Sequence, residues 1–176
     1  MSDAAQAGLG RRHGSWRTLL LIAVPIVIAD QATKVMIRRA LELHDSIAVI
    51  PGFLDLTHVR NTGAAFGLLN AVDFAFKPTL MMLIAFSALI ALGAYAVKLG
   101  AHERVARTGL ALILGGAVGN LLDRIQHGYV LDFVDVYYGD IHFWAFNVAD
   151  AAITVGAILV LFEVLFPGDR HASAAV

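Results

Sequence analysis

The chain has 176 residues, of which 59% are hydrophobic and only 15% are charged, and its mean hydropathy is +0.72. Soluble domains have about 45–50% apolar and about 25% charged residues, so an ordinary soluble domain is excluded. The net charge of −1 argues against nucleic acid as a partner, because phosphate binding needs a basic surplus. The absence of cysteine excludes disulfides, thiolate metal sites and a cysteine nucleophile. The composition indicates a small membrane protein.

Four apolar segments are long enough, or nearly so, to cross a membrane as helices, which takes about 20 residues. The run over residues 78–97 is uninterrupted and is bounded by Lys77 and Lys98. The other three segments carry polar residues toward one end. The sequence predicts transmembrane helices over residues 18–37, 78–97, 106–124 and 146–166, with outer loops over residues 38–77 and 125–145.

The basic residues indicate an orientation, since Lys and Arg accumulate on cytoplasmic loops. They precede the first span and fill the link between the second and third spans, which predicts that both termini are cytoplasmic. Arg38 and Arg39, at the far end of the first span, count against this orientation. The residues that favour it are Arg11, Arg12, Arg17, Lys98, Arg104 and Arg107.

A cleaved signal peptide over residues 11–32 is the alternative interpretation of the first span. It is disfavoured by the polar pair Asp30-Gln31 and by the lack of a convincing cleavage site.

The first outer loop contains the local signals for a small sheet. Residues 46–61 are rich in β-forming residues and include the turn pair Pro51-Gly52, which together predict two short strands. Residues 71–77 are expected to lie along the membrane interface. The predicted fold class is an all-α membrane protein: four transmembrane helices with a small extracytoplasmic β element and an interfacial helix, in one domain over residues 1–176.

The polar residues of the spans gather at one end of the predicted bundle. Consecutive spans run in opposite directions, so the polar residues of the first, third and fourth spans all fall on the outer side, whereas the second span contributes none. Residues three or four positions apart share a helix face. The pairs aligned in this way are Asp30/Lys34, Asn120/Arg124, Asn120/Asp123 and Asn147/Asp150.

Two interpretations of these charges remain open at this point. Asp30 with Lys34, and Asp123 with Arg124, can be ion pairs that only tie the helices together, because intramembrane charges commonly pair. They can equally support a functional site, because charges inside spans are costly. The glycines of residues 115–119, in a G-x-x-x-G spacing, indicate close helix packing rather than a ligand site.

Asp132 and Asp150 remain without an obvious cation once those four residues are paired. Two carboxylates held together in a partly dry site cannot both ionise easily and share a proton, an arrangement that activates water without a metal or a nucleophile. The alternative is structural: Asp150 caps the fourth helix, and Asp132 is solvated in a loop. Asp135 and Asp140 are interpreted as solvated loop residues.

Other functional classes fit the motifs and polar residues of this sequence less well. The chain has no G-x-S-x-G, no H-E-x-x-H and no P-loop sequence, and Ser46 is a weak partner for a Ser–Lys dyad with Lys34. A proton-coupled transporter needs polar residues along a whole route across the membrane, and the inner halves of the spans have almost none. A scaffold subunit explains the glycines and ion pairs but leaves Asp132 and Asp150 without a role.

Five motifs, in this order and spacing, resemble those of the lipoprotein signal peptidase (signal peptidase II) family over roughly residues 19–166. They are Asp30-Gln-Ala-Thr-Lys34, Asn61-Thr-Gly-Ala-Ala-Phe66, Gly119-Asn120-Leu-Leu-Asp123-Arg124, Asp132-Phe-Val-Asp135 and Phe146-Asn147-Val-Ala-Asp150.

The resemblance implies an aspartic endopeptidase of the bacterial inner membrane, with no metal or cofactor. Such an enzyme removes the signal peptide from diacylglyceryl-modified prolipoproteins just before the lipidated cysteine, at the outer face of the membrane. Its expected partners are lipidated prolipoproteins and membrane lipid. The catalytic pair falls on Asp132 and Asp150. The supporting positions are Asp30, Lys34, Asn61, Asn120, Asp123, Arg124 and Asn147.

Overall fold

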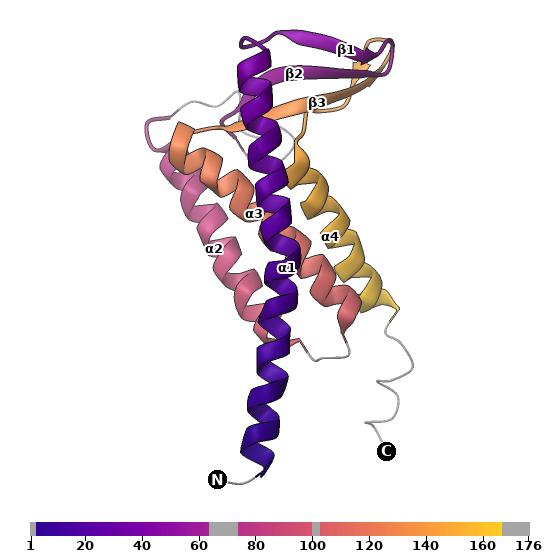
Figure 1. Ribbon diagram of the computed structural model, residues 1–176. Helices are drawn as coiled ribbons and strands as arrows, with labels where there is room; N and C mark the ends of the chain where they lie inside the picture. Colours follow the sequence, from indigo (N-terminus) through magenta and orange to yellow (C-terminus); the bar gives the residue numbers. More distant parts are fainter. Residues whose placement is uncertain (1–2, 64–73, 100–102, 167–176) are drawn as a thin grey trace.

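Four long helices stand beneath a small antiparallel sheet in the computed structural model, which describes residues 3–63, 74–99 and 103–166 (Figure 1). All four are long and apolar enough to cross a membrane, which confirms the four predicted spans and makes the protein a multi-pass membrane protein. The helices are α1 (Asp3–Ala40), α2 (Lys77–Lys98), α3 (Arg104–His127) and α4 (Val148–Leu165). The strands are β1 (Ser46–Ile50), β2 (Leu54–Asn61), β3 (Val130–Tyr138) and β4 (Ile141–His142).

The helix ends follow local sequence signals. Pro78 stands in the first turn of α2, where its missing N–H leaves no hydrogen bond unmade. Gly128 ends α3 in the left-handed conformation, with φ of 78°, and its N–H donates to the carbonyl of Arg124. Asn147 caps α4. These signals define the ends of α2, α3 and α4 that lie nearest the sheet (Figure 1).

The sheet has the order β1-β2-β3-β4, with neighbouring strands antiparallel. The predicted strand pair over residues 46–61 is confirmed as the β1–β2 hairpin. The segment after α3 was predicted as a loop, and this was wrong. Residues 130–138 form β3, which pairs with β2 and places Val59 opposite Asp132.

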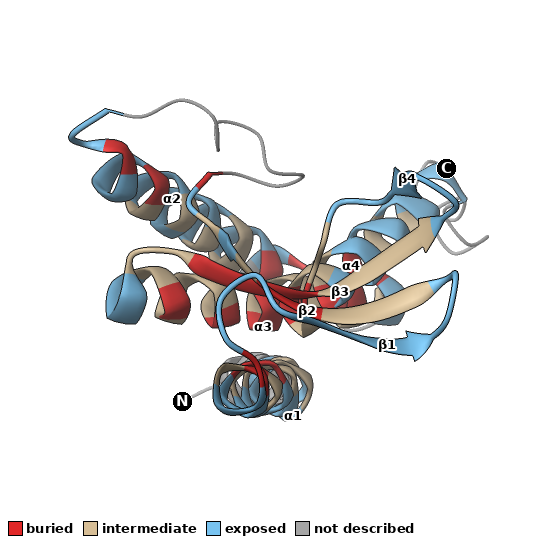
Figure 2. Cartoon of the chain, turned by 90° about the horizontal axis from the view of Figure 1, so that it is seen from above, coloured by how far each residue is buried: buried red, intermediate tan, exposed pale blue. Residues whose placement is uncertain are grey.

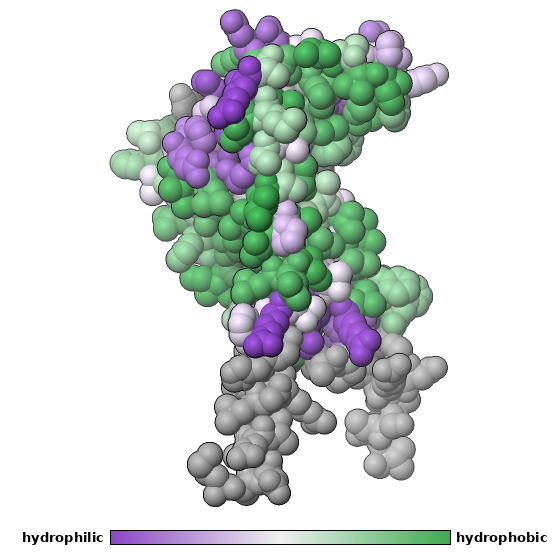
Figure 3. Space-filling view, in the orientation of Figure 1, coloured by the Kyte–Doolittle hydropathy of each residue, from purple (hydrophilic) through white to green (hydrophobic). Residues whose placement is uncertain are grey.

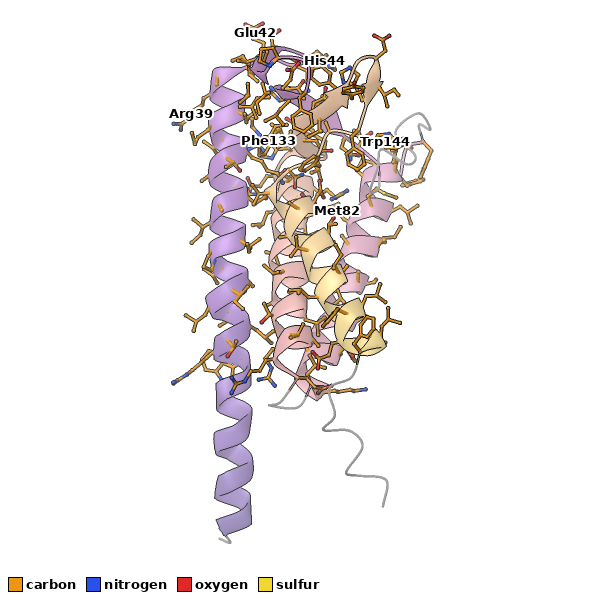
Figure 4. The ribbon with its side chains drawn as sticks, turned by 90° about the vertical axis from the view of Figure 1, so that its right-hand side faces the viewer. Arg39, Glu42, His44, Met82, Phe133 and Trp144 are labelled. Atoms are coloured by element: carbon orange, nitrogen blue, oxygen red, sulfur yellow. The ribbon has the colours of Figure 1, made fainter. Side chains whose placement is uncertain are left out.

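A small apolar cluster fixes the sheet on the C-terminal end of α1. Ile37 of α1 and Leu41, which directly follows the helix, pack against Leu131 and Phe133 of β3, and all four residues are buried. Figure 4 shows Phe133 between the sheet and the helices. Side chains alternate between the faces of a strand, so Asp132 lies on the opposite face from these two neighbours.

Helix α3 lies at the centre of the bundle and packs against each of the other helices (Figures 1 and 2). Its glycines face α1 and α4: a Cβ at Gly115 would meet the backbone of Ala23 in α1, and one at Gly116 would meet the carbonyl of Ala149 in α4. The expectation that these glycines serve close helix packing is confirmed.

The surface matches a membrane protein with its polar groups at the two ends. Figure 3 shows a broad hydrophobic region over the helices, with hydrophilic residues above and below it. Of the expected interfacial helix over residues 71–77, residues 71–73 lie outside the described residues. Residues 74–76 are not helical, and Lys77 already belongs to α2.

Candidate active site

A buried ion-pair cluster joins α1 and α3 near the ends of these helices that lie beside the sheet. The Lys34 ammonium lies 2.9 Å from Asp30 Oδ2 and 2.9 Å from Asp123 Oδ2, and it donates a third hydrogen bond to Asn120 Oδ1 at 2.9 Å. The side chains of Lys34 and of both aspartates are fully buried. All three N–H groups of the ammonium therefore have acceptors, which is what a buried charge requires.

The same two carboxylates also hold backbone of the neighbouring elements. Asp30 Oδ1 accepts from the N–H of Ala149 in the first turn of α4, at 3.0 Å. Asp123 Oδ2 accepts from the N–H of Leu131 in β3, at 3.1 Å. Gln31 donates to the carbonyl of Gly119 at 3.1 Å. The cluster thus fixes β3 and α4, the two elements that carry Asp132 and Asp150.

The predicted Asp30–Lys34 ion pair is confirmed, whereas the pairing of Asp123 with Arg124 is wrong. Asp123 pairs instead with Lys34 and, through Oδ1 at 2.8 Å, with Arg38. Consecutive helical residues point about 100° apart, so Arg124 faces away from its neighbour. Its guanidinium donates to the carbonyl of Gly63 at 2.9 Å and to that of Asn120 at 3.3 Å.

Asp132 enters the site from β3 and is only 3% exposed, so the alternative of a solvated loop aspartate is wrong. Each carboxylate oxygen accepts from a side-chain amide. Asn61 Nδ2 donates to Oδ2 at 3.0 Å, and Asn147 Nδ2 donates to Oδ1 at 2.7 Å. Asn61 stands at the end of β2, and Asn147 precedes α4, so three elements meet at this carboxyl group.

Asp150 occupies the third position of α4 and forms a capping box with Asn147. Asn147 Oδ1 accepts from the N–H of Asp150 at 2.9 Å, and Asp150 Oδ2 accepts from the N–H of Asn147 at 3.3 Å. The capping role offered as an alternative is therefore confirmed. Capping is not the only interaction of Asp150, because its Oδ1 also accepts a hydrogen bond from Asn120 Nδ2 at 2.8 Å.

Asn120 and Asn147 link the two aspartates to each other and to the ion-pair cluster. Asn147 Nδ2 lies 3.3 Å from Asn120 Oδ1, so the amides that hold Asp132 and Asp150 are in contact. Within the described residues, neither of these aspartates forms an ion pair closer than 4.0 Å. The expectation that Asp132 and Asp150 are left without a paired cation therefore holds for this part of the chain.

The charges of the site balance when the two aspartates hold one proton. The described residues bring together four carboxyl groups (Asp30, Asp123, Asp132 and Asp150) and three cations (Lys34, Arg38 and Arg124). Burial, followed by the neighbouring charge of Asp150, raises the pKa of Asp132 to about 7, although the hydrogen bonds from Asn61 and Asn147 favour its ionised form. The arrangement can hold a carboxylic acid beside a carboxylate near neutral pH.

Two nearby aspartates lie outside this arrangement. Asp140 is exposed in the turn after β3, as expected. Asp135 was interpreted as a solvated loop residue, but it lies in β3, where its Oδ2 is 2.8 Å from His142 Nδ1.

Sequence reasoning missed two participants. Arg38 was treated only as a boundary charge, although it lies one turn after Lys34 and thus on the same helix face. Lys77 was read only as the start of the second span. Its side chain is 4% exposed and bonds to Thr62, beside Asn61, so α2 also contributes a polar residue. Among the described residues there is no group of three His, Cys, Asp or Glu side chains suited to a metal ion.

Comparison with known proteins agrees with the motifs. The family described as signal peptidase (SPase) II matches residues 22–166. A lipoprotein signal peptidase of Geobacter sulfurreducens is 42% identical over 161 residues, covering 90% of this chain and 98% of the relative. That of Syntrophotalea carbinolica is 41% identical, covering 89% of this chain and 96% of the relative. A solved structure of a bacterial membrane enzyme is 39% identical, with a TM-score of 0.75, covering 84% of this chain and 87% of that one.

Proposed function

The chain belongs to the signal peptidase II family of aspartic peptidases that remove signal peptides from prolipoproteins, and on this premise we propose that Asp132 and Asp150 are its catalytic pair. The observation that carries the assignment is the difference in partners between the four carboxyl groups of the site, three of which are buried and one of which, Asp150, is partly buried. Asp30 and Asp123 are neutralised by Lys34 and Arg38, whereas the proposed pair accepts hydrogen bonds from neutral amides.

The chemistry follows from a pair that shares one proton. The ionised aspartate takes a proton from a water, whose oxygen attacks the scissile carbonyl carbon. The protonated partner donates a hydrogen bond to the carbonyl oxygen, where negative charge develops. The tetrahedral intermediate then breaks its C–N bond, and a proton passes from the pair to the leaving amine. The pair titrates as a unit, so the shared proton is assigned to both residues together.

The surrounding residues hold the pair in place. Asn61, Asn120 and Asn147 orient the two carboxyl groups through amide hydrogen bonds. The cluster of Asp30, Lys34 and Asp123 fixes α1 and α3 against β3 and α4. Arg124 holds the backbone of Gly63, close to Asn61, and its charge acts on both aspartates of the pair. These roles are supporting ones.

The location of the site suits a substrate that arrives within the bilayer. The pair lies at the end of the helices that carries the sheet, so a signal helix lying among lipids can bring its cleavage point to that depth (Figure 1). We infer that this end faces outward and that both termini are cytoplasmic, in a bacterial inner membrane. The inferred substrate is a prolipoprotein whose cysteine carries diacylglyceryl, and the whole chain forms one peptidase domain.

A direct test uses the purified protein in detergent with a synthetic prolipoprotein segment. The segment is supplied with and without diacylglyceryl on its cysteine, and each reaction is run both with and without a chelator. We expect cleavage just before the lipidated cysteine, unaffected by the chelator, and little cleavage of the unlipidated segment. Products are identified by mass spectrometry.

The other functional classes predict different results. A transporter would move protons across liposomes without cleaving the segment, and a scaffold subunit would do neither. Dependence of cleavage on added metal would contradict the aspartic mechanism. Equal cleavage of both segments would contradict the inferred substrate class.

A further inference from the structure

A buried lysine stands at the start of α2, outside the network that holds the proposed catalytic pair. Lys77 is the first residue of the helix, and only 4% of the residue is exposed. Its ammonium donates a hydrogen bond to Thr62 Oγ1 at 3.0 Å. The contact joins α2 to the segment that directly follows β2.

This position is an unfavourable one for a cation. The first turn of a helix carries partial positive charge from its free N–H groups, which favours acidic rather than basic side chains. Burial adds a desolvation cost for an ammonium group. No acidic residue stands in the first turn of α2 to offset these terms locally. The hydrogen bond from Lys77 to Thr62 nevertheless connects this buried ammonium group to the segment that follows β2.

Residues 61–63 form a tight turn that is attached to the site at each residue. Asn61 donates to Asp132 Oδ2 at 3.0 Å, Lys77 donates to Thr62, and Arg124 donates to the carbonyl of Gly63 at 2.9 Å. Within the turn, the N–H of Gly63 donates to Asn61 Oδ1 at 3.0 Å. That bond occupies the amide oxygen of Asn61 and so leaves the amide nitrogen directed at Asp132.

We propose that Lys77 is a positioning residue for catalysis, which fixes the 61–63 turn through Thr62 and thereby keeps the amide of Asn61 on Asp132. The inference rests on the proposed function of Asp132. It also gives α2 a part in the site, through its first residue.

The proposed role has a signature in the pH dependence of cleavage. A hydrogen bond donated by Asn61 stabilises the ionised form of Asp132. The other groups that act on Asp132 are Asp150 from α4, Lys34 from α1, Arg124 from α3 and the amide of Asn147. Substitution of Lys77 leaves all of these in place but removes a positive charge, whereas Thr62→Val keeps the ammonium group, so a shift of the pH profile that both variants share reports on the Asn61 contact.

The test compares Lys77→Met with Lys77→Arg and with the matched control Lys98→Met, at the exposed other end of the same helix. Steady-state cleavage of a diacylglyceryl-modified prolipoprotein segment is measured between pH 5 and pH 9. For Lys77→Met we expect kcat to fall by about 10- to 100-fold, the range for a small misplacement of a catalytic group. KM should change little, and the acidic limb of the profile should move to higher pH. Lys77→Arg should recover most of kcat, and Lys98→Met should match the wild type.

A second variant covers the outcome in which Lys77→Met fails to fold. Thr62→Val removes the acceptor while keeping the branched shape of the side chain, and it should produce the same fall in kcat and the same shift of the acidic limb. In a folded double variant the effects should not add, because both changes break one contact.

Two results would overturn the positioning role while leaving the proposed function intact. One is wild-type kcat and pH profile in Lys77→Met or Thr62→Val. The other is a loss of folded yield or a change of KM with the pH profile unmoved, which would make Lys77 a structural residue only. Failure of the wild-type protein to cleave the segment would instead refute the proposed function itself.

Discussion

Replacing Asp132 by asparagine should make the stability of the protein less dependent on pH. The pKa of this carboxyl group is raised from 3.8 to about 7 by burial and by Asp150, so the folded state binds its proton more tightly than the unfolded chain does. Between these two values the folded state carries more protons. The free energy of unfolding therefore falls as the pH rises from about 4 to about 7.

The expected size follows from the shift itself. A displacement of about three pH units corresponds to about 4 kcal/mol of stability lost by pH 8, at about 1.4 kcal/mol per unit. The asparagine side chain of the variant cannot ionise and avoids this loss. Its amide nitrogen, however, must face one of the two donors, Asn61 or Asn147, which costs about 1–3 kcal/mol at every pH. Asp132→Asn should therefore be less stable than the wild type at pH 4 and more stable at pH 8.

Thermal unfolding in detergent measures this crossover. The chain has no cysteine for a thiol-reactive dye, so tryptophan fluorescence and circular dichroism are the suitable signals. The difference in Tm between Asp132→Asn and the wild type should rise by several degrees from pH 4 to pH 8, at about 2–4 °C per kcal/mol. Asp140→Asn, at an exposed position, is the control and should follow the wild type. A difference in Tm that stays constant over this range would refute the reasoning.

The remaining predictions concern the support of the site and its orientation. Asp30→Asn should lower Tm and folded yield as well as turnover, because it leaves a buried charge without its partner at a cost of about 3–5 kcal/mol; unchanged melting with no activity would place Asp30 among the catalytic residues instead. Gly116→Ala should separate α3 from α4, because its Cβ meets the carbonyl of Ala149, and should lower kcat by at least about tenfold together with Tm; wild-type kinetics would show that the helices yield without disturbing the pair. A reporter fused after Val176 should be active in the cytoplasm, and activity only outside would reverse the inferred orientation.

The spans and the grouping of polar residues were predictable because they depend on local patterns. Hydrophobic runs gave four helices, and the alternation of their direction gave one polar end. The i,i+4 spacing of Asp30 and Lys34 gave their ion pair, which the structure contains at 2.9 Å. Each of these inferences uses residues close in the sequence or a property of whole segments.

Pairings between distant segments were not predictable in the same way. Arg38 and Asp123 are 85 positions apart, and although Arg38 shares a helix face with Lys34, that spacing does not indicate that Arg38 rather than the adjacent Arg124 neutralises the aspartate. The hydrogen bond between Lys77 and Thr62 depends on how the chain returns from the sheet to α2. Such contacts are decided by tertiary packing.

Strand β3 is an intermediate case. Its sequence, Val130 to Tyr138, is rich in β-branched and aromatic residues, a signal that could have predicted a strand. The position was read as a loop because it connects two spans, and its pairing partner β2 lies far back in the chain. The consequence was specific: Asp132 was singled out because it was left without an obvious cation, and the resemblance then placed it in the catalytic pair, but its burial and its amide partners became known only from the structure.

The most direct test of the central claim is the cleavage rate of Asp132→Asn, Asp150→Asn and the double variant on a diacylglyceryl-modified prolipoprotein segment, with binding of the segment measured in parallel. Each single variant should lose about 10²–10⁴-fold in kcat while still binding the segment, because an asparagine side chain cannot take a proton from water. The double variant should be scarcely slower than either, since residues that act as a unit are strongly non-additive. Substantial turnover by either single variant would contradict the account and leave the two residues with capping and packing roles.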